Sequence, residues 1–415
     1  MTVSIITVGD ELLVGRVVDT HAAFLSAQLS ALGVNVCAHR SVGDRSGELE
    51  VAIREECRRA SALVIAGGLG PTEDDRTREE IAAACGCLLE FREEWWAKIE
   101  ERMRRVGVRV SNRNERQAYF PRGAEGLENR FGSAPGFQIE RDGVAIWALP
   151  GVPHEFRGMI EEVALPEIER RFKPSPQSQR VWTFHGVPES TLDAWILETL
   201  EGAQHPFNHH ICVRGGEIEV RLPSDFDLGA PAREKFGSRC LGEGDETVAE
   251  RVVKEATEAG VQIALAESCT GGKIAGRLTD IPGSSQVFAS GWVTYANDRK
   301  EIELGVAREL FRSHGAVSGP VVEAMADGAW KKSGATFALS TSGIAGPNGG
   351  TTEKPVGTTW FGFASEKGVF SAHRYFRGDR ERIRMLSVTQ ALVCILAAIR
   401  GEDPFPWSEP KGRPE

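Results

Sequence analysis

The chain has 415 residues, of which 41% are hydrophobic and 26% are charged. This length predicts two or three domains, and the composition is that of globular proteins, which excludes general disorder and a fibrous repeat. Its 49 basic residues stand against 59 acidic ones, so the formal net charge is −10. Because an acidic protein repels phosphate-rich surfaces, we expect neither direct nucleic-acid binding nor a membrane surface as its partner.

The amino terminus has no basic segment and reaches Asp10 too early for a signal peptide. No run of about 18 apolar residues follows it, so we expect a cytoplasmic protein. The eight cysteines lack the paired C-x-x-C spacing of structural zinc sites, and in a large cytoplasmic chain they are weak evidence for disulfides. Most of them should be small buried hydrophobic residues.

Residues 1–172 alternate short β-rich runs with amphipathic helical patterns. The strand patterns lie at 3–8, 34–39 and 63–66, and the pattern at 144–149 resumes a buried strand. Strand and helix in alternation predict an α/β domain with a parallel sheet, whose ligand loops follow the carboxyl ends of the strands.

Two prolines and small polar residues at 173–178 predict a linker. Beyond it, residues 175–245 predict a small α+β domain, and residues 247–400 predict a third domain, again α/β. The adjacent His209 and His210 do not predict a metal site, because neighbouring side chains on a strand point to opposite faces. Residues 401–415 contain four prolines and predict a flexible tail.

A glycine-rich loop in the first domain follows an apolar strand pattern and leads into a helix, with Gly67, Gly68 and Gly70 ahead of Asp74 and Asp75. Glycines allow several backbone N–H groups to point at one anion, and a helix start adds positive potential. Two carboxylates beside a phosphate would repel it unless a divalent cation lay between them. The alternative is that both aspartates only cap the helix.

Three other segments point to the same edge of the sheet. Asp10 and Glu11 follow the first strand pattern, Ser133 lies in a Gly-Ser-Ala-Pro-Gly loop, and Glu155 follows the Pro-Gly-Val-Pro segment after residue 149. If the sheet is parallel, these side chains share one rim with the glycine loop.

With these four motifs in order, residues 2–170 resemble the molybdopterin-binding domain family, in the subgroup found at the amino end of CinA proteins. The resemblance implies a nucleotide or pterin-nucleotide pocket and, in that subgroup, hydrolysis of ADP-ribose to AMP and ribose 5-phosphate with Mg, Mn or Co. The metal-side acids would be Asp10, Glu11, Asp74, Asp75 and Glu155, and the substrate-binding residues Gly67, Gly68, Gly70 and Ser133. One departure is Arg45, where the family more often carries Asn.

In the third domain, residues 263–273 predict a strand, a small-residue turn and a helix, with Ser268 at the strand end. The amides of Gly271 and Gly272 are placed to bind an anion or a developing oxyanion. A serine there usually caps a helix, and a nucleophilic serine requires a base. Cys269 is the competing nucleophile, because thiolates at helix starts are activated.

Two kinds of base are available to Ser268. A Ser-His-Asp arrangement would need His314 or His373 to fold into the site. Alternatively Lys300, five residues after Tyr295, can act as the base if it is desolvated and neutral. The competing interpretation of Lys300 is an exposed lysine at a helix start.

A further loop at 340–351 adds hydroxyl groups and glycines after a strand pattern. Two cations that could bind a phosphate follow it, Lys354 and Arg380. Residues 247–399 thereby resemble the CinA carboxyl-terminal domain, a nicotinamide mononucleotide deamidase. The resemblance implies that Ser268 attacks the carboxamide of nicotinamide mononucleotide without a metal or other cofactor. The residues handling protons would be Tyr295, Lys300 and Ser342, and those holding the nucleotide Thr270, Gly271, Gly272, Gly343, Gly346, Gly349 and Arg380.

The whole chain is therefore expected to be a homodimeric enzyme of pyridine nucleotide recycling. Two alternatives remain open. The amino-terminal domain can be a non-catalytic nucleotide- or pterin-binding module. The protein can also be a competence or DNA-damage accessory protein that acts through protein contacts.

Overall fold

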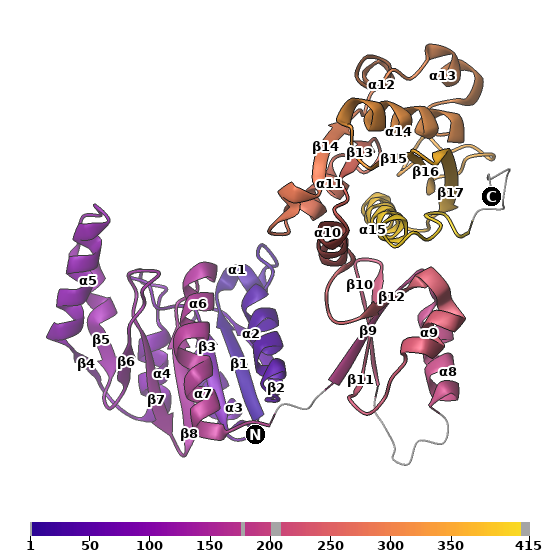
Figure 1. The fold of residues 1–415 in the computed structure, drawn as a ribbon. Helices are drawn as coiled ribbons and strands as arrows, with labels where there is room; N and C mark the ends of the chain where they lie inside the picture. Colours follow the sequence, from indigo (N-terminus) through magenta and orange to yellow (C-terminus); the bar gives the residue numbers. More distant parts are fainter. Residues whose placement is uncertain (1, 176–178, 201–208, 408–415) are drawn as a thin grey trace. The chain divides into compact units, whose positions relative to one another are not determined.

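The computed structural model describes residues 2–175, 179–200 and 209–407 (Figure 1). The chain divides into two compact units, residues 1–177 and 178–415, and the division falls inside the predicted linker. Each unit has its own hydrophobic core and is described by itself.

The amino-terminal unit is a six-stranded sheet in the order β2-β1-β3-β8-β7-β6. Its first four strands in this order are parallel, as the sequence predicts, whereas β7 and β6 form an antiparallel edge. Every residue of β3 and β8 is buried, because helices cover both faces of a parallel sheet. The strands are β1 (Thr2–Val8), β2 (Asn35–Val42), β3 (Ala62–Ala66), β6 (Glu125–Leu127), β7 (Gly136–Arg141) and β8 (Val144–Leu149).

Two hydrophobic clusters fill the space between this sheet and its helices. One cluster includes residues of α3 and α4, and the other includes residues of α2, α6 and α7. The helices are α1 (Asp10–Leu13), α2 (Thr20–Ala31), α3 (Glu48–Glu56), α4 (Thr77–Cys85), α5 (Glu93–Arg105), α6 (Pro153–Met159) and α7 (Leu165–Phe172). A small ladder of β4 (Leu89–Phe91) and β5 (Tyr119–Pro121) stands beside them.

The second unit begins with a four-stranded antiparallel sheet in the order β10-β11-β9-β12. Two helices pack on one face, which gives the βαββαβ arrangement of ferredoxin-like domains. The sequence indicated only two of these strands, because β10 is short and mostly exposed and β12 has four residues. The elements are β9 (Gln179–His185), α8 (Glu189–Thr199), β10 (His210–Arg214), β11 (Glu217–Pro223), α9 (Gly229–Phe236) and β12 (Cys240–Glu243).

The last domain is a five-stranded sheet in the order β14-β13-β15-β16-β17. The first three strands are parallel and the last two are antiparallel. The strands are β13 (Ile263–Glu267), β14 (Phe288–Val293), β15 (Phe337–Gly343), β16 (Thr358–Ser365) and β17 (Gly368–Tyr375). The helices are α10 (Val248–Ala259), α11 (Lys273–Thr279), α12 (Asn297–Leu304), α13 (Arg308–His314), α14 (Gly319–Ser333) and α15 (Arg380–Ile399).

Helix α15 is the core helix of this domain. Within the described residues it is also long and apolar enough to cross a membrane, but 67% of its apolar window is buried inside the protein. Its apolar side chains pack in the same cluster as those of α10 and β13. The domain core therefore accounts for the hydrophobicity of this helix.

The small sheet and the last domain form one compact unit although the sequence separated them at residues 245–247. His185 Nε2 lies 3.2 Å from Gln390 Oε1, and Thr389 Oγ1 donates to the carbonyl of Gly215 at 2.5 Å. Glu217 accepts the Val248 amide at 2.9 Å and so caps α10. These polar contacts join the two parts through helices α10 and α15.

The predicted flexible tail is wrong for residues 401–407. Phe405 is fully buried, and the Trp407 ring lies 6.4 Å from that of Phe361. Aromatic side chains bury large apolar areas, which outweighs the prolines that suggested a frayed end. Residues 408–415 lie outside the described residues.

Candidate active sites

The carboxyl-terminal site lies where three parallel strands end at one edge of the sheet. Glu267, the last residue of β13, is paired with Val293 of β14 and Thr341 of β15. The amide of Ser268 donates to the carbonyl of Thr341 at 3.0 Å. Ser268 directly follows β13, and Ser342 lies near the end of the neighbouring strand β15, so the two serines lie at the same edge of the sheet.

Two buried contacts shape the loop at residues 268–272. The carboxylate of Glu267, which is 1% exposed, accepts the amides of Ile274 at 3.1 Å and Ala275 at 2.8 Å. From α15, Arg384 donates to the carbonyls of Cys269 at 3.0 Å and Thr270 at 2.9 Å. Neither Glu267 nor Arg384 was a predicted site residue, and only the tertiary structure brings Arg384 to this loop.

The loop amides differ from the prediction in one respect. Gly271 and Gly272 have φ of 62° and 84°, in the region that favours glycine. The Gly271 amide donates to the Ser268 carbonyl at 3.1 Å, so it is already used within the turn. The Gly272 amide has no hydrogen-bond partner within the described part of the chain, and it remains the candidate donor to an anion. Thr270 is fully buried, with its hydroxyl 2.9 Å from that of Thr341.

Lys300 on α12 is buried, with 1% of its surface exposed, which rules out the exposed-lysine interpretation. Its Nζ donates to the carbonyls of Thr294 at 2.8 Å and Tyr295 at 3.2 Å. Burial lowers the pKa of Lys300, while the nearby Cys269 and Asp298 act in the opposite direction. A neutral amine has two N–H groups, and both are used here. Its lone pair is then left free to accept a proton.

The other predicted residues of this site have partners of their own. The hydroxyl of Ser342 donates to the carbonyl of Ala316 at 2.8 Å. Tyr295 is 60% exposed, and its hydroxyl accepts a hydrogen bond from Arg380 Nη2 at 2.9 Å. The same guanidinium donates through Nη1 to the carbonyl of Gly346 at 2.7 Å. Arg380 therefore joins Tyr295 to the loop at Gly346.

The cysteine alternative and one of the two histidine candidates lose support. Burial raises the pKa of Cys269 to about 12, so its thiol stays protonated and is a poor nucleophile. His373 lies on β17, two strands beyond β15, where its ring packs against Trp360 at 4.7 Å. Lys354, expected near a phosphate, donates instead to the carbonyl of His314 at 2.6 Å.

The amino-terminal site is a cavity of about 380 Å³ at the carboxyl ends of β1, β3 and β8. Its lining contains five carboxylates and no lysine, arginine or histidine. The structure brings together all the predicted residues of this site except Asp10, and it adds Asp44. Those lining the cavity are Glu11, Asp44, Gly67, Gly68, Gly70, Asp74, Asp75, Ser133 and Glu155.

The loops that line this cavity require glycine at points where two backbones come close together. Gly67 has φ of 108°, and a Cβ there would lie 2.6 Å from the carbonyl oxygen of Val8. A Cβ on Gly151 would lie 3.1 Å from the Gly67 Cα. The loops after β1, β3 and β8 therefore meet through their backbones, which leaves the cavity open to a ligand.

The charges in this cavity fit a divalent cation. The pKa of Asp44 is raised, first by burial and then by the neighbouring Asp10, Glu11 and Asp74. Among the described residues, no three His, Cys, Asp or Glu side chains lie close enough to hold a metal on their own. Mg²⁺ is commonly held by one or two carboxylates together with substrate phosphates. The donors therefore fit such an ion in kind and in charge.

Several of these carboxylates have hydrogen-bond partners within the protein. Asp75 accepts hydrogen bonds from the amide and hydroxyl of Thr72, and Glu155 accepts one from Asn129 Nδ2 at 2.6 Å. Asp10, outside the cavity lining, exchanges backbone-to-carboxylate hydrogen bonds with Asp44 at 2.9 and 3.3 Å. Glu11 makes no side-chain hydrogen bond among the described residues. Hydrogen bonds to the Thr72 side chain and to its own backbone lower the pKa of Asp74, so this carboxylate stays ionised and can bind a cation.

Comparison with known proteins matches both halves of the chain. Residues 245–399 match the family described as "CinA C-terminal domain", and residues 4–170 match the "Probable molybdopterin binding domain". A CinA-like protein of Anaeromyxobacter sp. (strain Fw109-5) is 42% identical over 410 residues, covering 96% of this chain and 99% of that protein. A CinA-like protein of Geotalea daltonii is 37% identical over 403 residues, covering 94% and 97%.

A solved structure is also similar in sequence. The competence/damage inducible protein CihA from Agrobacterium tumefaciens is 44% identical, covering 37% of this chain and 93% of its own, with a TM-score of 0.36.

Proposed function

The chain belongs to the CinA family, and we propose that its carboxyl-terminal domain hydrolyses nicotinamide mononucleotide to nicotinate mononucleotide and ammonia. The observation that carries this proposal is the environment of Lys300. A buried amine whose two N–H groups are held by the carbonyls of Thr294 and Tyr295 is suited to act as a general base.

In the first step Ser268 Oγ attacks the carboxamide carbon while Lys300 Nζ accepts the hydroxyl proton. The tetrahedral intermediate carries negative charge on the former carbonyl oxygen, and the Gly272 amide, unpaired among the described residues, would stabilise it. When the C–N bond breaks, the Lys300 ammonium returns the proton to the leaving nitrogen, and ammonia departs. A water molecule then attacks the ester, giving the carboxylic acid and restoring the Ser268 hydroxyl.

The positively charged side chains of the site support an anionic substrate. Arg380 is exposed and donates to the hydroxyl of Tyr295 and the carbonyl of Gly346. Arginine suits phosphate recognition because its planar fork offers several donors at once. Arg384 is committed to the carbonyls of the nucleophile loop, so it positions Ser268 and does not bind the phosphate.

Incubation of the full chain with nicotinamide mononucleotide tests this proposal. Ammonia and nicotinate mononucleotide should form in equal amounts, and the Ser268→Ala variant should form neither. Release of nicotinamide in place of ammonia would mean cleavage of the glycosidic bond and would overturn the amidase mechanism.

For the amino-terminal unit we propose metal-dependent hydrolysis of ADP-ribose to AMP and ribose 5-phosphate. A cavity lined by five carboxylates beside a glycine cradle supports it, because a pyrophosphate can approach those carboxylates only with a cation between them. The bound cation would neutralise the charge that develops on the phosphates. Glu11 and Asp74 would hold it, and the backbone at Gly67, Gly68 and Gly70 would cradle the phosphates.

Incubation with ADP-ribose and Mg²⁺, Mn²⁺ or Co²⁺ tests the second activity, with AMP as the product to follow. Lack of AMP with every metal, together with calorimetric binding of ADP-ribose, would replace hydrolysis by the binding-module alternative.

A further inference from the structure

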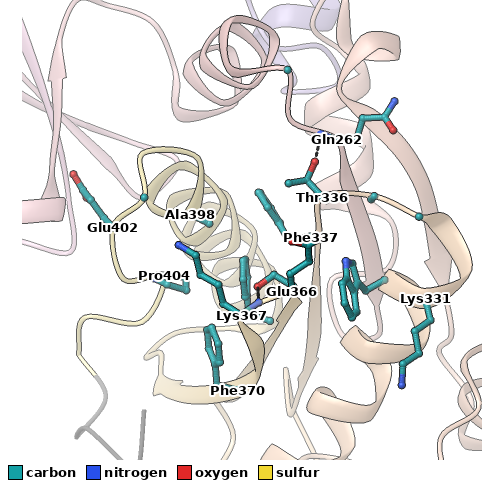
Figure 2. A pocket seen from close by; sticks show the side chains of 17 residues that line it. Gln262, Lys331, Thr336, Phe337, Glu366, Lys367, Phe370, Ala398, Glu402 and Pro404 are labelled. Atoms are coloured by element: carbon teal, nitrogen blue, oxygen red, sulfur yellow. Dashed lines mark hydrogen bonds between the residues drawn. The ribbon is translucent and has the colours of Figure 1, made fainter. Parts of the chain in front are cut away.

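A second cavity of the amino-terminal unit adjoins the carboxylate cavity. It encloses about 250 Å³ between α5 and the loop at residues 128–135. Ser133 lines both cavities, so the two lie next to each other at this residue. The largest cavity described here, of about 760 Å³ in the last domain (Figure 2), has no comparable link to either candidate active site.

The two adjoining cavities differ in charge. Helix α5 presents Lys98, Arg102 and Arg105 to the second cavity, at the i, i+4 and i+7 positions of one helix face. Arg105 pairs with Glu101 at 3.0 Å, whereas Lys98 and Arg102 make no ion pair among the described residues. Glu101 and Glu128 also line the cavity, so three basic groups stand against two acidic ones. The adjoining cavity has carboxylates alone.

The two unpaired cations are held in place at this cavity. Lys98 Nζ lies 4.3 Å above the ring of Trp95, which also lines the cavity. Arg102 donates to the carbonyl of Arg130 at 2.5 Å, and this bond uses only one of its five N–H groups. Both side chains therefore keep donors for an anion.

The loop between the cavities is rigidly built. Asn129, 4% exposed, donates to Glu155 at 2.6 Å and to the carbonyl of Ala134 at 2.9 Å. Its carbonyl oxygen accepts the amides of Phe131 and Gly132, both at 2.9 Å. A Cβ on Gly132 would lie 1.8 Å from the Glu155 carboxylate, so this loop passes directly against the acidic cavity.

We propose that the second cavity binds an additional phosphate, so that the amino-terminal site prefers ADP-ribose phosphorylated on its adenosine ribose over ADP-ribose itself. The inference rests on the hydrolase function proposed for this unit. The ribose adjoins the pyrophosphate in such a substrate, as the basic cavity adjoins the carboxylate cavity at Ser133. Its phosphate would bind Lys98 and Arg102 directly, whereas the pyrophosphate requires a cation.

Steady-state hydrolysis of ADP-ribose and of its 2′-phosphate by the full chain with Mg²⁺ tests the inference. The phosphorylated substrate should have a kcat/KM roughly tenfold higher, the size of effect expected from charge-assisted hydrogen bonds. Lys98→Ala and Arg102→Ala should each remove most of this preference while leaving ADP-ribose hydrolysis unchanged. Arg104→Ala is the matched control, because Arg104 lies on the same helix but pairs with Glu100 and does not line the cavity.

The outcomes separate this inference from the function on which it rests. Equal kcat/KM for the two substrates, or a preference that survives both variants, would overturn the inference and leave the hydrolase function standing. If neither substrate is cleaved, the hydrolase function fails, and calorimetry with adenosine 2′,5′-bisphosphate and AMP decides the second cavity. Tighter binding of the bisphosphate that depends on Lys98 and Arg102 would support the site, and equal binding would overturn it.

Discussion

The two candidate active sites share one backbone design and differ in their charges. Each lies at the carboxyl ends of parallel strands, where an apolar strand ends in a glycine-containing loop, at residues 66–71 in one unit and 342–347 in the other. The first is lined by carboxylates without a basic residue, whereas the second has a buried lysine and two arginines. Similar loops at the ends of parallel strands therefore carry opposite charge in the two units, and an anionic substrate would need an added cation only at the first site.

The largest expected effect concerns the base that the chain supplies itself. Ser268→Ala and Lys300→Ala should each lower kcat for ammonia release by about three orders of magnitude or more, and the double variant should lose little beyond either single one. Residues that act as one unit have such non-additive effects, so a double-mutant cycle on kcat is the measurement. Additive losses would break the proposed pairing of Ser268 with Lys300.

The next effect concerns the divalent cation proposed for the amino-terminal site. Replacement of Glu11 and Asp74 by Gln and Asn should lower AMP formation by roughly a hundredfold or more, because the electrostatic site for the metal is removed. Ammonia release from nicotinamide mononucleotide should be unchanged. Chelation of divalent ions should likewise lower AMP formation and leave ammonia release unchanged. Loss of both activities with the chelator would contradict this distinction between the sites.

A third prediction concerns the pH dependence of deamidation at the carboxyl-terminal site. Only neutral Lys300 can accept the Ser268 proton, and burial lowers its pKa below the ordinary 10.5. The rate of deamidation should therefore rise about tenfold per pH unit below that pKa and level off above it, at a pH below 10.5. Lys300→Arg should be inactive across the range, because a guanidinium stays protonated. A rate independent of pH from 5 to 10 would contradict the role of this lysine.

The smallest expected effect is at the neighbouring thiol. Cys269→Ala should retain deamidation within about threefold, because the thiol is protonated and buried and takes no part in the reaction. Thermal unfolding should show a modest loss of stability, of about 1 kcal/mol, from the removed sulfur atom. Abolished ammonia release in a folded variant would instead point to Cys269 as the nucleophile.

The features that local sequence determines are found where the sequence placed them. The apolar runs ending at Ala66 and Glu267 are parallel strands, and glycine loops with a helix follow them. These signals are readable because hydrophobic periodicity and the turn preferences of glycine act over a few residues. The strand pattern also predicted that the loops after these strands share one rim of the sheet. Eight of the nine amino-terminal candidates, all but Asp10, line one cavity there.

Other features were decided by contacts between distant segments. The sequence left Lys300 open between an exposed and a desolvated state, and its burial follows from the packing of α12 in the folded domain. Arg384 reaches the loop at Cys269 across 115 positions of the chain, and Phe405 enters a core whose other members begin at Leu241. The residue types and their spacing indicate which side chains are chemically suited to catalysis or binding. Their burial, and so their protonation and partners, depends on which surfaces the fold brings together.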